Sequence, residues 1–254
     1  MLGWSGADPW SDQAGAIKRG FMQTHPLMPS FRATARFIGA SFLVSTTAYM
    51  VGSAMVASAL AVDGGQLTTS SGGLVSGVLL QLVNSAAVVM IGAFFYPLLR
   101  SRSEPVALGY LSARVIESIL LAIGGLVTLA VLAAGQGAAA GSDLVLASVS
   151  RLAYQFAMIA LSLGSLPFCA LLYRARLIPR WLSALGLVGY ATLLVGSMLE
   201  LYGLDLRLLH NLPGGLFELI LPLWLLGRGF NQTVLSTSPD LAHKRVASAS
   251  LPNR

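Results

Sequence analysis

Three residues with helical spacing stand inside an apolar run and are the first candidates for chemistry. Tyr110, Arg114 and Glu117 are separated by four and three positions, which places them on one face of a helix. A carboxylate in a hydrophobic segment is costly and faces protein or water rather than lipid. Glu117 therefore has two interpretations. It forms a structural ion pair with Arg114 that orients helices, or it accepts a proton or binds a cation in a pocket that water reaches.

The preceding apolar segment carries an amide that bears on this choice. Asn84, with Gln81 and Ser85, would line the pocket at Glu117 if the second and third helices pack as neighbours. An asparagine in the middle of a span also commonly hydrogen-bonds across a helix interface. Both interpretations of Asn84 stay open from the sequence.

A second polar group surrounds the last three apolar segments. Its members are one cation, one amide, two carboxylates and one imidazole: Arg151, Gln155, Glu200, Glu218 and His210. Glu218 lies about 7 Å inside a helix that starts at Pro213, deep enough to need a partner. We predict an ion pair between Arg151 and Glu218 that ties the fourth helix to the sixth. The alternative role of this group is the mouth of a ligand pocket.

The elements that must position these residues are membrane spans. Of the 254 residues, 55% are hydrophobic and 10% are charged, whereas about a quarter of a soluble domain is charged. The mean hydropathy of +0.74 agrees. Most of the surface must therefore face lipid, so the lipid bilayer is the predicted partner. The net charge of +6 then indicates membrane orientation rather than nucleic-acid binding.

Six segments are long and apolar enough to cross about 30 Å of hydrocarbon. They are Phe37–Val62, Leu74–Leu99, Tyr110–Ala134, Leu152–Tyr173, Trp181–Leu201 and Pro213–Phe230. The predicted fold is an all-α, polytopic integral membrane protein with a six-helix domain at residues 37–230. Residues 1–36 are predicted as a tail, either loose or with a short surface helix, and residues 231–254 as a disordered polar tail.

Basic residues gather in alternate loops and predict the orientation. The N-terminal tail, the loops after the second and fourth spans and the C-terminal tail are basic, whereas the opposite loops carry Asp63, Asp143 and Asp205. By the positive-inside rule both termini are cytoplasmic, which requires an even number of spans. Tags at the two ends should therefore report from the same face of the membrane.

The same boundary sets the expected depth of the first site. With the cytoplasmic limit of the third span near Ala113, Glu117 lies about 6 Å inside the hydrocarbon. Arg114 neutralises it within the same helix and extends its guanidinium group back to the interface. Both residues are therefore expected near the cytoplasmic edge of the domain.

The residue inventory excludes several chemistries. The only histidines are His25, His210 and His243, the only cysteine is Cys169, and no HExxH, GxSxG, Walker or GxGxxG motif occurs. No metal or other cofactor is therefore expected. Three classes of function remain. They are handling or binding of a small molecule or ion through buried carboxylates, a non-catalytic interaction or regulatory subunit that binds a protein partner or a second copy of itself, and an intramembrane enzyme, which has the least support.

Three runs of sequence carry a resemblance to a known family. They are RVIESILL at residues 114–121, LLYRARLIPRWLSALGLVGY at residues 171–190 and PGGLFELILPLWLLGRGF at residues 213–230. In this order and spacing they resemble the family catalogued as domain of unknown function 4386, over about residues 31–232. The resemblance implies a bacterial protein with six spans in the plasma membrane. It supplies no catalytic or binding residues.

Overall fold

The computed structural model describes residues 31–59, 62–63, 66–67, 71–134, 142–204, 206 and 209–231. Six long helices form the domain: α2 (Phe31–Ala59), α3 (Ser71–Arg100), α4 (Glu104–Ala134), α5 (Ser142–Ala175), α6 (Arg180–Leu201) and α7 (Leu212–Gly227). Two short antiparallel strands, β1 (Val62–Asp63) and β2 (Gln66–Leu67), lie between α2 and α3. A 3-10 turn, η2 (Leu209–Asn211), precedes α7. The surface helix predicted before residue 30 and nearly all of the predicted C-terminal tail lie outside the described residues.

Helices α2 to α6 each meet the length and hydropathy of a membrane span, and α7 does so together with η2, over Leu209–Gly227. Their outer faces are apolar as well, since large side chains such as Leu79, Leu126, Val188 and Leu223 are exposed. A soluble protein does not cover its surface with such side chains, whereas lipid accepts them. The predicted all-α, six-span fold is confirmed within the described part of the chain.

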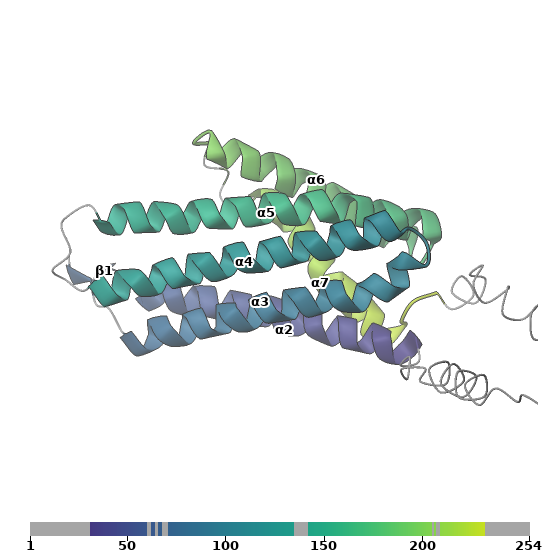
Figure 1. Ribbon diagram of the computed structural model, residues 1–254, viewed down its shortest axis with the longest axis horizontal. Helices are drawn as coiled ribbons and strands as arrows, with labels where there is room; N and C mark the ends of the chain where they lie inside the picture. Colours follow the sequence, from purple (N-terminus) through teal and green to yellow (C-terminus); the bar gives the residue numbers. More distant parts are fainter. Residues whose placement is uncertain are drawn as a thin grey trace, which may run out of the picture. The chain divides into compact units, whose positions relative to one another are not determined.

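The six helices close into a ring. Each helix packs against the next one along the chain, and α7 packs against α2 to complete the circle. Successive helices run in opposite directions, so the start of α2 and the end of α7 lie at the same end of the bundle (Figure 1). The turns between α3 and α4 and between α5 and α6 lie at this end too. This arrangement agrees with the predicted even number of spans.

That end of the bundle is strongly basic, and we call it the basic end. Among the described residues it carries one carboxylate, Glu104, and eight arginines: Arg32, Arg36, Arg100, Arg102, Arg174, Arg176, Arg180 and Arg228. Glu104 forms an exposed ion pair with Arg100 at 3.8 Å. The charge of the described residues at this end is therefore almost entirely positive.

The start of α4 lies earlier than the sequence analysis placed it. The carbonyl of Ser103 accepts a hydrogen bond from the amide of Ala107, and Glu104 and Pro105 occupy the first turn. An acidic residue and a proline are both favoured in the first turn, because they suit the unpaired amides there. Residues 104–109 thus belong to the helix, and Glu117 lies farther from the helix start than predicted.

An aromatic layer fills the bundle between its centre and the basic end. Phe95 of α3 packs edge-on against Phe168 of α5, with ring centroids 4.9 Å apart, and against Tyr110 and Phe230 at 5.9 Å. Tyr110 stacks on Phe168 at 4.1 Å. All four side chains are buried. The layer therefore joins α3, α4 and α5 to the residues after α7 by close ring packing.

Small residues bring α2 and α3 close together. A Cβ atom added to Gly77 would lie 2.8 Å from the carbonyl oxygen of Gly52 and 2.9 Å from a methyl group of Val56. Backbone atoms cannot move aside as a side chain can. Gly77 is therefore needed for the observed spacing of the two helices.

Replacing Gly77 by alanine should destabilise the protein by about 1–3 kcal/mol, because α2 and α3 must separate. Gly72 is the matched control: it lies on the same helix, and an added Cβ there meets nothing within 4 Å. Gly72→Ala should be neutral or stabilise by up to about 1 kcal/mol, since alanine favours helix. Unfolding of both variants in detergent measures this, and equal effects would contradict the account.

Candidate functional site

The centre of the bundle holds one guanidinium group and its counter-charges. Arg114 donates from Nη1 to Oε2 of Glu117 at 2.9 Å and from Nε to the hydroxyl of Tyr110 at 3.1 Å. These three residues share one face of α4, as their spacing predicted. With Glu218 and Tyr190, described below, they form what we call the central cluster.

Arg114 does not reach back to the interface, contrary to the expectation from sequence. Its side chain is only 2% exposed, and its guanidinium carbon lies 5.6 Å from the ring centroid of Phe42 on α2. Arg114 lies ten residues into α4 and Glu117 thirteen, about 15 and 20 Å from the helix start. Both are therefore near the middle of the bundle, because α4 begins at Glu104.

Glu218 of α7 is the second carboxylate at this guanidinium group. Its Oε1 lies 3.7 Å from Nη2 of Arg114 and accepts a hydrogen bond of 2.9 Å from the hydroxyl of Tyr190 on α6. The predicted pair between Arg151 and Glu218 is wrong. Arg151 is exposed on α5, because the rotation of that helix turns it away from the interior.

The central cluster has more carboxylates than cations, and its two carboxylates differ in their exposure. One guanidinium group faces two carboxylates, so the cluster carries one excess negative charge when both are ionised. Glu117 is 5% exposed and Glu218 is 27% exposed. Both contacts of Glu218 use Oε1, and no described residue bonds to its Oε2. Glu218 is therefore the more exposed and less fully bonded of the two carboxylates.

Asn84 forms a hydrogen bond between helices and does not contact the central cluster. Helices α3 and α4 do pack as neighbours, but the Asn84 side-chain oxygen accepts a hydrogen bond of 2.6 Å from Ser45 on α2. Gln81 donates to Ser53, also on α2, at 3.4 Å. The two amides thus join α3 to α2.

A second cluster gathers three of the predicted residues farther from the basic end. Gln155 of α5 donates a hydrogen bond to Glu200 of α6, and Nδ1 of His210 lies 3.6 Å from Oε1 of the same carboxylate. Glu200 is twenty residues into α6, about 30 Å from the helix start. The two clusters therefore lie at different depths.

His210 is held tightly in this second cluster. A Cβ atom added to Gly196 would lie 2.3 Å from the imidazole ring, so only glycine leaves room for it. The ring is buried, and neither nitrogen has a hydrogen-bond partner among the described residues. An apolar groove of about 460 Å³ opens beside it, lined partly by Thr192 and Leu206. The second cluster therefore lies at a surface opening.

Metal chemistry has no support in this arrangement. Within the part of the chain that the structure describes, no three residues of the types His, Cys, Asp and Glu come together closely enough to hold a metal ion. The donors that are present form one ion-paired cluster and one amide, carboxylate and imidazole cluster. Such groups can exchange a proton or bind a monovalent or organic cation.

The sequence analysis missed one residue of the central cluster and one residue that packs against it. Tyr190 bonds Glu218, and Phe42 covers the face of the Arg114 guanidinium group. Tyr190 gave a usable signal, because a tyrosine buried in a span normally finds a partner for its hydroxyl. Phe42 gave none, since a phenylalanine in a span looks the same whether it faces lipid or a cation.

Fold and composition together define the class: the chain is a polytopic integral membrane protein of six helices. Its sequence matches the family described as Domain of unknown function (DUF4386) over residues 37–229. The protein belongs to this family, as the resemblance indicated. No curated protein and no solved structure matches the chain.

Replacing Arg114 by glutamine should destabilise the protein by about 3–5 kcal/mol, because two buried carboxylates lose their cation. The matched control is Arg151→Gln, which removes an exposed arginine from a neighbouring helix. It should change stability by no more than about 0.5 kcal/mol. Denaturant unfolding in detergent measures both, and an Arg114 variant as stable as the control would contradict the assignment.

Proposed function

We propose that this membrane protein binds and exchanges a proton or a small cation at Glu218, with Arg114 and Glu117 as a fixed ion pair behind it. One observation carries the proposal: two carboxylates share one buried guanidinium group. An excess negative charge in a low-dielectric interior is costly unless a positive species neutralises it. A proton or a bound cation supplies that charge.

The contacts of Glu218 support its role as the exchanging group. Its single hydrogen bond comes from Tyr190, and its Oε2 has no partner among the described residues. Glu117 is nearly enclosed and bonds Arg114 directly at 2.9 Å. Protonation or cation binding at Glu218 would therefore leave a balanced pair of one cation and one carboxylate.

A polar stripe on α6 supports a connection between the two clusters. Tyr190, Ser197 and Glu200 are separated by seven and three positions, which places them along one face of the helix. Ser197 is fully buried, and its hydroxyl has no hydrogen-bond partner among the described residues. The aromatic layer lies on the opposite side of the central cluster, toward the basic end. The proposed path therefore runs from the second cluster to the central cluster.

The proposal also includes the orientation of the protein and the membrane in which it lies. The basic end would face the cytosol of a bacterium, and the bundle would lie in its plasma membrane, as the positive-inside rule and the family resemblance predict. The second cluster would then lie toward the outer leaflet. A cation would reach Glu218 from that side.

Proteoliposomes that contain a pH-sensitive dye, with sodium or potassium gradients in parallel arms, test the proposal. Wild-type protein should carry protons or one of these cations across the bilayer under an imposed potential. Glu218→Gln should reduce the flux to about the level of empty liposomes, because an amide cannot bind a proton or cation in this way. The variant keeps the Arg114–Glu117 pair and should fold.

Glu104→Gln is the matched control, because Glu104 is an exposed carboxylate at the end of the bundle. Its flux should equal that of the wild type. Monodispersity and unfolding in detergent confirm that each variant is folded. Full flux through a folded Glu218→Gln protein would overturn the proposal. Absence of any flux through the wild type would also overturn it, and would favour a non-catalytic interaction role.

A further inference from the structure

Negative charge is concentrated around Glu200 in the second cluster. Among the described residues, no arginine or lysine forms an ion pair with this carboxylate. The basic group beside it is the imidazole of His210, with Nδ1 3.6 Å from Oε1. Glu200 also lies in the last turn of α6, where the helix dipole leaves a partial negative charge that favours a cation. The carboxylate and the end of the helix therefore attract the same kind of ligand.

Buried polar atoms near Glu200 have no hydrogen-bond partner among the described residues. They include Oε1 of Gln155, both ring nitrogens of His210 and Oγ of Ser197. The three side chains belong to residues that are only 4%, 7% and 0% exposed. A buried polar atom without a partner is costly. The gathering of several such atoms therefore indicates a binding site for a polar species.

Direct contacts hold these atoms around one carboxylate. The amide nitrogen of Gln155 donates to Oε2 of Glu200, so the oxygen of the same amide group lies close to the carboxylate as well. His210 lies at the other carboxylate oxygen, Oε1. Ser197 is three residues before Glu200, on the same face of α6. The unpartnered atoms therefore come from α5, α6 and η2 but surround a single group.

The chemistry of these atoms favours a cation over an anion. The amide oxygen of Gln155 and an ionised Glu200 can only accept hydrogen bonds, and the Ser197 hydroxyl and a neutral imidazole can each offer a lone pair. Carboxylate, carbonyl and hydroxyl oxygens are the ligands of hard cations. With a neutral imidazole, the second cluster carries one negative charge, which one monovalent cation balances.

We propose that the second cluster binds a monovalent alkali cation, sodium or potassium. Glu200, the amide oxygen of Gln155 and the Ser197 hydroxyl supply oxygen ligands, and His210 lies beside them. A transition metal does not fit, because within the described part of the chain no three residues of the types His, Cys, Asp and Glu come together at one point.

The position of the site allows a cation to enter from water and keeps the site apart from Glu218. Glu200 is about 30 Å along α6 from the basic end, which is about the thickness of the hydrocarbon, and its side chain is 18% exposed. Tyr190, which bonds Glu218, is ten residues earlier on α6, a separation of about 15 Å. The proposed alkali site can therefore be filled whether or not Glu218 exchanges a proton.

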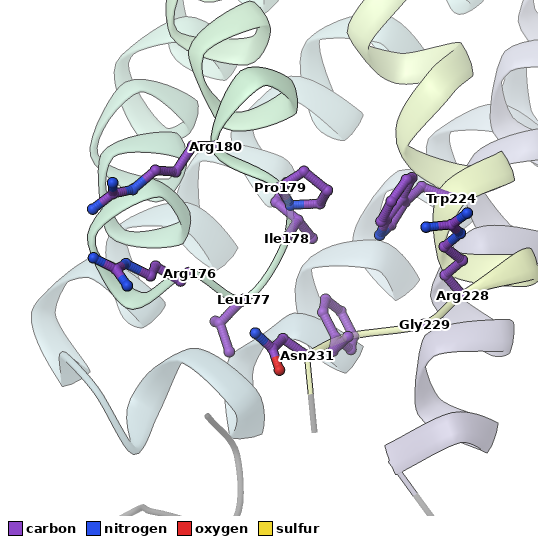
Figure 2. A pocket seen from close by; sticks show the side chains of 10 residues that line it. Arg176, Leu177, Ile178, Pro179, Arg180, Trp224, Arg228, Gly229 and Asn231 are labelled. Atoms are coloured by element: carbon purple, nitrogen blue, oxygen red, sulfur yellow. The ribbon is translucent and has the colours of Figure 1, made fainter. Parts of the chain in front are cut away.

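The pocket at the basic end, in contrast, is unsuited to a cation. Figure 2 shows this pocket, which has a volume of about 410 Å³ and is lined in part by Arg176, Arg180 and Arg228. No carboxylate is among the described residues that line it. Positive side chains repel a cation, so the described residues offer an alkali cation a better site at the opposite end of the bundle.

Thermal unfolding of the purified full chain in neutral detergent tests the proposal. Sodium chloride or potassium chloride replaces choline chloride stepwise at constant ionic strength. A ligand that binds only the folded protein raises the Tm as its concentration increases, so the Tm of the wild type should rise in at least one alkali arm. Glu104→Gln, which changes an exposed carboxylate at the basic end, should show the same rise. An equal Tm of the wild type in choline and in both alkali salts would overturn the proposal.

The site is assigned by variants in the Glu218→Gln background, which removes the proposed exchanging carboxylate. Glu218→Gln should keep the rise in Tm, and Glu218→Gln/Glu200→Gln should lose it. If that double variant does not fold, Glu218→Gln/Gln155→Met serves instead and should require a severalfold higher alkali concentration for the same rise. A rise that persists without Glu200, or that is lost with Glu218 alone, would place the cation elsewhere and overturn the proposal. Loss of proton flux in Glu218→Gln leaves this result unchanged, so the two proposals can fail separately.

Discussion

A guanidinium group in the middle of six apolar helices must find its counter-charges inside the protein, because lipid offers none. Arg114 takes one carboxylate, Glu117, from its own helix and a second, Glu218, from α7. Helix α7 is also the helix that closes the ring against α2. The need to neutralise one charge therefore selects which face of α7 turns inward and, through the hydroxyl of Tyr190, which face of α6 does so as well.

The same interaction explains why structural and functional interpretations of the carboxylates need not compete. Glu117 is enclosed and directly bonded to Arg114, as a structural ion pair requires. Glu218 is more distant from the guanidinium group and more exposed, and one of its oxygens has no partner among the described residues. Under the proposed function, two carboxylates at one cation divide the roles: Glu117 holds the helix, and Glu218 exchanges a proton or cation.

The fold could be predicted because lipid imposes a simple rule, about 20 apolar residues for each crossing. The pairing of Arg114 with Glu117 could also be predicted, because both lie on one helix face. The partner of Glu218 could not. Spans are apolar all round, so hydropathy does not reveal helix rotation, and Arg151 was assigned to the interior although it faces outward. The depth of Glu117 was underestimated, because the helix start at Glu104 was not recognised.

A double-mutant cycle between Arg114 and Glu218, read by denaturant unfolding in detergent, tests the central claim most directly. Glu218→Gln should stabilise the protein more in the Arg114→Gln background than in the wild type, because it then removes a carboxylate that has no cation beside it. The predicted coupling is at least about 1 kcal/mol, against additivity within about 0.5 kcal/mol for the cycle of Arg151 with Glu218. Additive effects of Arg114→Gln and Glu218→Gln would contradict the account.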